Sequence, residues 1–133
     1  MDLDIFLSQN KIKKENVKFA ASQSFQLDGE PVLWEIRALS GDEEEKIRVL
    51  CIMEQNGKKV FDNARYLGKI AAASTVYPDL FNEKLQDSYG VWGEDELLKK
   101  MLTAGEYIEY IKKVQEVNGF SKSMNELKDE AKK

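Results

Sequence analysis

The first third of the chain consists of short apolar segments separated by turns. Residues 1–23 begin with an apolar cluster and continue as a polar, lysine-rich stretch, which predicts one helical turn followed by a loose arm. Aromatic and β-branched residues at 25–27 and 32–38 flank the dipeptide Asp28-Gly29. Asp-Gly favours a tight turn, because glycine adopts positive φ freely and aspartate tolerates it. This stretch therefore predicts a β-hairpin.

The second strand of this hairpin predicts one buried face. Successive side chains of a strand point to opposite faces. Trp34, Ile36 and Ala38 therefore share one face, and Glu35 and Arg37 share the other. We expect the face that carries Trp34 and Ile36 to lie in the core.

From residue 40 onward the spacing of apolar residues is typical of helices. Ser40 and Glu43 have the spacing of a capping box, which predicts a helix that begins there and stops before Asn56-Gly57. A second helix is predicted from 62 to 77, because Pro78 disfavours helical backbone in the residue before it. The small segment 71–74 would allow another helix to approach closely.

Three more helices are predicted in the second half of the chain. Two short ones lie within 78–90 and 94–102, and a longer one begins at Thr103, the first residue of another capping box, and ends at Asn118-Gly119. Its apolar stripe is wide enough to face the core of its own domain. The stripe consists of Tyr107, Ile108, Ile111, Val114 and Val117.

Length and composition indicate a single globular domain. The chain has 133 residues, of which 42% are hydrophobic and 10% aromatic, enough to form a sizeable core. The predicted fold class is mainly α with a small amino-terminal β-hairpin (α+β), arranged as a compact helical domain over residues 1–120. The polar, charge-mixed residues 121–133 predict a charged flexible tail.

Charge and residue types exclude several classes of function. The 20 Lys and Arg residues against 24 Asp and Glu residues give a net charge of -4, which argues against nucleic acid as a partner. The longest apolar run is far shorter than the ~20 residues of a membrane span, and the start of the chain lacks the features of a secretory signal. Cys51 is the one cysteine and histidine is absent, so an internal disulfide, Ser-His or Cys-His catalysis and ordinary zinc sites are excluded.

Acidic clusters are the remaining candidates for catalysis or metal binding. None has the spacing of a calcium loop, and two lie at predicted helix starts, where the helix dipole favours negative charge. A structural role is the preferred interpretation, and no catalytic, cofactor-binding or metal-binding residue is predicted. The clusters are Asp2 with Asp4, residues 43–45, Asp79 with Glu83 and Asp87, and residues 94–96.

An acidic, aromatic-rich domain without catalytic residues is typical of a protein that binds another protein. Aromatic side chains with a polar edge are favoured in protein interfaces. We therefore predict Tyr89, Trp92 and Tyr110 as exposed protein-binding residues.

The order of several segments resembles a known family. The run Pro-Val-Leu-Trp-Glu-Ile-Arg at 31–37, which follows the Asp-Gly turn, is similar to the amino half of the XkdN-like phage tail assembly chaperones. The resemblance extends over about residues 1–120, and it depends on order and spacing rather than on one diagnostic motif. Similarity to the carboxyl half of that family is carried by residues 78–80, 85–91, 96–102, 105–107 and 118–120.

The resemblance implies a non-enzymatic phage or prophage protein in the cytoplasm of a bacterial host. Its implied partner is the tape measure protein, which it would keep soluble until the tail tube polymerises around it, and the tail tube protein is a second candidate partner. A structural tail or head-completion component retained in the virion is the alternative, which detection in purified particles would favour. A DNA-binding regulator is a third hypothesis, which the acidic charge opposes. None of these implies an oligomeric state.

The family resemblance also implies a longer second form made by backward ribosomal slippage near the stop codon. Ala131-Lys132-Lys133 is compatible with the slippery sequence A-AAA-AAG. An ordinary solvated tail is the preferred interpretation, and the codons of the gene decide between the two.

Overall fold

The computed structural model describes residues 2–120, and its centre is a small antiparallel sheet. The strand order is β1-β4-β7, so β4 hydrogen-bonds to a neighbour on each side. Phe19 lies opposite Trp34, and Ile36 lies opposite both Val17 and Thr75. The strands are β1 (Val17–Phe19), β4 (Trp34–Ile36) and β7 (Thr75–Tyr77).

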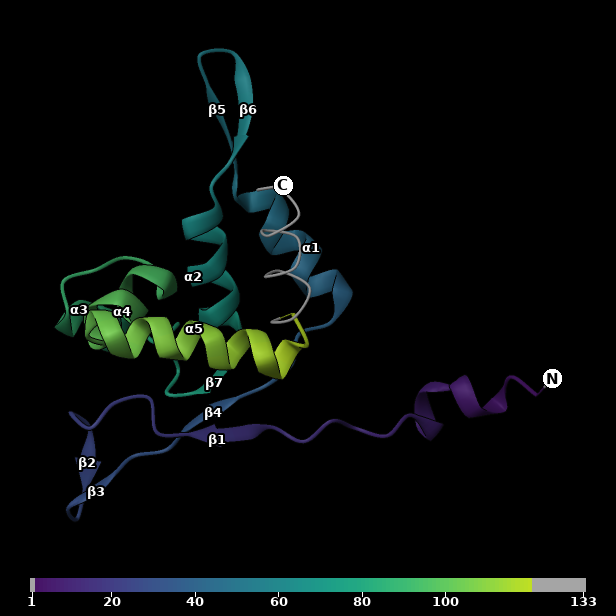
Figure 1. Ribbon diagram of the computed structural model, residues 1–133, viewed down its shortest axis with the longest axis horizontal. Coiled ribbons are helices and arrows are strands. Elements are labelled where there is room, and N and C mark those ends of the chain that lie inside the picture. Colours follow the sequence, from purple (N-terminus) through teal and green to yellow (C-terminus); the bar gives the residue numbers. More distant parts are fainter. Residues whose placement is uncertain (1, 121–133) are drawn as a thin grey trace, which may run out of the picture.

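The α-helices group on one side of this sheet (Figure 1). Helix α2 packs against α1, α4 and α5, and the Tyr110 side chain of α5 contacts the sheet. Two short 3₁₀ helices lie in an amino-terminal arm that extends away from this body (Figure 1). The helices are η1 (Asp4–Phe6), η2 (Ser8–Asn10), α1 (Gly41–Leu50), α2 (Asn63–Ser74), α3 (Glu83–Ser88), α4 (Glu94–Met101) and α5 (Ala104–Asn118).

Two hairpins project from the body of the protein (Figure 1). Strands β2 (Gln26–Leu27) and β3 (Glu30–Pro31) form the first, and β5 (Ile52–Gln55) and β6 (Lys58–Phe61) form the second. Each has a two-residue turn with positive φ at both positions, 53° and 81° at Asp28-Gly29 and 51° and 76° at Asn56-Gly57. Such turns match the twist of the paired strands. The predicted turn at Asp28-Gly29 is confirmed.

The predicted fold class is wrong. The structure is about 48% helical and 18% strand, an α+β mixture with three small sheets rather than a mainly helical domain with one hairpin. None of the strands in the described residues has more than four residues. Apolar periodicity identifies such short strands poorly, and the pairing of β1 with β4 depends on contacts between segments that are distant in sequence.

Two predicted helices extend too far. The helix from residue 40 ends at Leu50, and Asn56-Gly57 is the turn of a hairpin and not a helix end. Asn-Gly is common both at helix ends and in hairpin turns, since each requires positive φ. The helix predicted from 62 to 77 ends at Ser74, and the last three residues form β7. Thr75 and Val76 are β-branched, which favours a strand.

The buried face of β4 is confirmed. Trp34 is 1% exposed and Ile36 is 0% exposed. The stripe predicted on α5 is correct for Ile111, Val114 and Val117, which are buried. Ile108 is instead exposed and Tyr110 is buried, because α5 is rotated so that position 110 faces the sheet.

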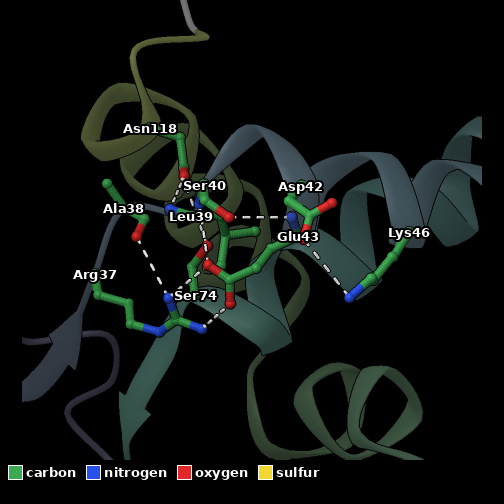
Figure 2. Close-up of polar contacts among 9 residues, drawn as sticks. All are labelled: Arg37, Ala38, Leu39, Ser40, Asp42, Glu43, Lys46, Ser74 and Asn118. Atoms are coloured by element: carbon green, nitrogen blue, oxygen red, sulfur yellow. Dashed lines mark hydrogen bonds and ion pairs between the residues drawn. The ribbon is translucent and has the colours of Figure 1, made fainter. Parts of the chain in front are cut away.

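Polar side chains join the ends of β4, α2 and α5 to the start of α1 (Figure 2). The Asn118 side chain accepts a hydrogen bond from the Leu39 backbone N–H at 2.7 Å and donates one to the Ser74 hydroxyl at 3.1 Å. The capping box of Ser40 and Glu43 is present, as predicted. The Glu43 carboxylate also accepts two hydrogen bonds from the Arg37 guanidinium, at 3.0 and 2.6 Å.

These contacts change the acidity of Glu43. The Arg37 guanidinium and the Ser40 backbone N–H lower the pKa of the Glu43 carboxyl from 4.5 to about 2. Folding therefore favours the ionised form of Glu43.

Replacement of Trp34 by alanine tests the placement of the core. Trp34→Ala should lower the free energy of unfolding by about 3–5 kcal/mol, because it empties a fully buried site. Trp92→Ala is the matched control, since Trp92 is 93% exposed, and it should change stability by less than about 0.5 kcal/mol. Chemical denaturation of both variants measures the difference, and equal losses would contradict the placement.

Acid titration of stability tests the Arg37–Glu43 contact. A lowered pKa in the folded state stabilises the protein above the unfolded value of 4.5, and that stabilisation is lost as pH falls toward about 2. Glu43→Gln should therefore be less stable than the parent protein at pH 6, and the difference should shrink as pH falls through about 2 and vanish below it. Gln preserves the capping box, so the comparison isolates the charge. The side chains are 38% and 40% exposed, which limits the effect to about 1 kcal/mol. A pH-independent difference would exclude this account.

Candidate protein-binding site

Two of the four acidic clusters, residues 43–45 and 94–96, contain side chains that form ion pairs in the fold. Glu43 binds Arg37, and Lys69 lies 2.9 Å from Glu94 and 3.2 Å from Asp95. Within residues 2–120, no cluster of three or more acidic, cysteine or histidine side chains is arranged to hold a metal ion. Cys51 is buried, and burial raises the pKa of its thiol. The ion pairs of Glu43, Glu94 and Asp95 give these carboxylates a structural role. The candidate site therefore lies on an apolar surface.

One apolar groove lies between the sheet and helices α3 and α4. Its volume is about 230 Å³ and it is open to solvent. It is smaller than the roughly 300–1,000 Å³ of typical small-molecule pockets, and its size suits apolar side chains of another protein. We call it the Tyr89 groove, and it is lined by Phe25, Val32, Trp34, Tyr77, Pro78, Leu85, Tyr89 and Met101.

Trp34 connects the groove to the core. Its ring packs edge-to-face on Tyr110, with ring centres 5.2 Å apart, and its centre lies 6.4 Å from that of Phe25 at the groove. Tyr110 and Thr75 share a hydrogen bond of 2.6 Å between their hydroxyl groups. Burial raises the pKa of Tyr110 further above its ordinary value of 10, so the phenol stays neutral. The groove therefore has a rigid, uncharged base.

The structure separates the three predicted binding residues. Tyr89 is half-buried at the Tyr89 groove, and Trp92 is 93% exposed in the same connection between α3 and α4. Gly90 and Gly93 have φ of 66° and 132°, which permits the turns on either side of Trp92. Tyr110 is 0% exposed, so the expectation of an exposed Tyr110 is wrong. It supports Trp34 from inside the core.

Of the residues that line the groove, sequence reasoning predicted only Tyr89 as a binding residue. Tyr77 is 56% exposed at the end of β7, and Phe25 precedes β2. The helix that the sequence predicts from 62 to 77 includes Tyr77. A helical Tyr77 gives no reason to place this side chain beside Tyr89. The β-branched residues before it and Pro78 after it are a signal for a strand end.

A second apolar surface lies at the end of α1 and along the second hairpin. Its side chains are 40–63% exposed, and they are Val49, Leu50, Ile52, Met53, Val60 and Phe61. The sequence predicts that the helix continues to residue 55, and that prediction gave no indication of this surface. Contiguous exposed apolar residues of this kind are typical of protein contact sites.

In the part of the chain that the structure describes, no helix has both the length and the apolar character needed to cross a bilayer.

Comparisons with known proteins agree with the resemblance found in the sequence. Residues 3–132 match the family model described as phage XkdN-like tail assembly chaperone protein. The chain is 28% identical to the phage-like element PBSX protein XkdN of Bacillus subtilis (strain 168), over 98% of this chain and 93% of that protein. It has the same identity and coverage with YqbN of the same organism. The crystal structure of YqbN has a TM-score of 0.81 and 28% identity, covering 90% of this chain and 98% of that chain.

Proposed function

Because the chain belongs to the XkdN-like phage tail assembly chaperone family, we propose that it binds the phage tape measure protein and keeps it soluble. Binding would last until the tail tube polymerises around the tape measure protein in the cytoplasm of the bacterial host. In this proposal the chaperone performs no chemical reaction and leaves before the tail is complete. The single observation that supports the proposal is an open apolar groove bordered by Tyr89. Trp92, 93% exposed in the same connection, lines a separate depression beside Arg65 and Lys69.

The shape and lining of the Tyr89 groove suit an amphipathic helix. Such a helix binds a groove through apolar residues spaced three or four positions apart. One of these could occupy the space between Tyr77, Leu85 and Tyr89. The remaining contacts would extend over the connection that carries Trp92.

Tyr89 and Trp92 are the residues that we assign to this contact. Aromatic residues in a binding surface contribute a large contact area at low entropic cost, and a few of them often dominate affinity. Tyr89 borders the groove and Trp92 presents almost its whole side chain to solvent. Tyr110 contributes indirectly, because it holds Trp34 in place.

Co-expression with the tape measure protein of the same phage tests the proposal. The parent chaperone should increase the soluble fraction of the tape measure protein, and the Tyr89→Ala/Trp92→Ala variant should lose most of this effect. Removal of two interface aromatics should weaken binding at least about tenfold. A pull-down of the soluble fraction measures binding directly.

Two controls separate binding from folding. Ile108→Ala changes an apolar side chain that is 55% exposed on α5, outside the Tyr89 groove, and it should solubilise the client fully. Thermal unfolding must show that the double variant is folded. The proposed contact residues are wrong if the folded double variant still solubilises the client. The proposed function is wrong if the parent protein has no effect on the client or remains in purified particles.

A further inference from the structure

The amino-terminal arm, residues 2–13, presents apolar side chains that the rest of its own chain leaves uncovered. Their exposed fractions range from 44% to 91%. The arm extends well beyond the sheet and helices (Figure 1). These side chains are Leu3, Ile5, Phe6, Leu7 and Ile12.

Two hydrogen bonds attach the root of the arm, which is its end nearest to β1, to the rest of the protein. The Lys14 ammonium donates a hydrogen bond of 2.5 Å to the backbone carbonyl of Val117, and the Asn16 side chain donates one of 2.9 Å to Glu35. Strand β1 begins one residue later. The free part of the arm therefore starts just before Lys14, and its apolar end is displaced from the core.

A surface that could receive this arm lies on α1 and the second hairpin. Asp42, Glu45, Lys46, Val49 and Leu50 line an open depression of about 500 Å³ along the outward face of α1. Ile52 and Phe61, which pair at the base of the adjoining hairpin, are 47% and 41% exposed, and the Phe61 ring also contacts Tyr66 of α2. We call this surface, together with Lys58 and Lys59 near the turn, the α1–hairpin face.

The charges along the arm are complementary to the charges along the α1–hairpin face. Along the arm, the acidic Asp2 and Asp4 come first, apolar residues follow, and the basic Lys11 and Lys13 come last.

The α1–hairpin face has the opposite signs in the same order. Lys58 lies near the turn opposite Gln55, Lys59 lies opposite Glu54, apolar residues lie between, and Glu45 and Asp42 lie at the start of α1. Lys46 pairs with Asp42 at 3.7 Å, and Glu45 remains available to a further cation. An arm that runs antiparallel to α1 would bring opposite charges together at both ends.

The lengths also agree. From residue 4 to residue 13, two 3₁₀ turns and three extended residues span about 20 Å. From Asp42 to the middle of the hairpin, the rise of a helix and of a short strand adds up to about 20 Å.

From these observations we propose that the arm of one chain docks on the α1–hairpin face of a second copy. The arm does not cover the face of its own chain, although its root lies beside Ser40 at the start of α1. A second copy provides the same face with the same charges. Exchange of arms in this way is a common route to dimers.

Analytical ultracentrifugation of the purified full-length chain tests the proposal without any client, so its outcome does not depend on the proposed chaperone function. The parent protein should form dimers or larger assemblies. An arm variant, Ile5→Asp/Phe6→Asp, and a face variant, Val49→Gln/Leu50→Gln, should each associate at least about tenfold more weakly.

Mixing the two variants identifies the partner of the arm. The face variant has an intact arm and the arm variant has an intact face, so an equimolar mixture should form mixed dimers. A mixture that stays monomeric would overturn the proposal, because an arm folded onto its own chain cannot be complemented by another. A monomeric parent protein would also overturn it.

Leu27→Asp is the matched control for the arm variant. Leu27 is 69% exposed on the first hairpin, similar to Phe6 at 71%, and lies outside both surfaces. It should leave association unchanged. An equal loss of association with Leu27→Asp would indicate nonspecific apolar contact and would overturn the assignment. Circular dichroism verifies that each variant is folded.

Discussion

The contact between Tyr110 and Trp34 determines how the elements of this protein are assembled. Tyr110 lies on α5, packs edge-to-face on Trp34 of β4, and lies 6.2 Å from the ring of Phe19 on β1. Its hydroxyl group shares a hydrogen bond with Thr75 at the start of β7. One side chain thus contacts all three strands of the central sheet. Aromatic pairs in this geometry contribute stability beyond their buried area, and the shared hydrogen bond satisfies a polar group that would be costly to bury alone.

A second set of contacts, formed by polar groups around Asn118, lies at the carboxyl end of α5. Asn118 binds Leu39 before α1 and Ser74 at the end of α2, and its amide also donates to the carbonyl of Val114. The start of α1 is therefore held against the ends of two other helices. Because α1 is held at its start, its outward face and the hairpin beyond it project into solvent. The hydrogen bonds at the start of α1 thus fix the position of the exposed apolar side chains near its end.

The family assignment and the surfaces lead to a consistent view of the molecule. A tail assembly chaperone must present apolar groups to other proteins and still fold by itself. This chain buries Trp34 and Tyr110 in the core and leaves Trp92, Tyr77 and several aliphatic side chains exposed. The Tyr89 groove and the α1–hairpin face lie on different elements, so the client binding and the self-association that we propose would use separate surfaces.

Local sequence determined the turns, the helix caps and the buried face of β4. The Asp28-Gly29 turn, both capping boxes and the αL residue Gly119 follow from the conformations of a few neighbouring residues. The same local signals predicted that Trp34 and Ile36 are buried. Tyr89 and Trp92 were predicted as contacts because aromatic side chains with a polar edge are favoured in protein interfaces, and that prediction is untested.

Only the tertiary structure decided which segments form the sheet and which apolar residues face outward. Val17–Phe19 is a strand because Trp34–Ile36 offers it hydrogen bonds, and no pattern within three residues specifies that partner. Ile108 and Tyr110 are both compatible with an apolar stripe, and the rotation of α5 against the sheet buried Tyr110 and exposed Ile108. Asn56-Gly57 suits a helix end and a hairpin turn equally, since both need positive φ. Which of the two forms depends on whether the strands on either side can pair, as β5 and β6 do here.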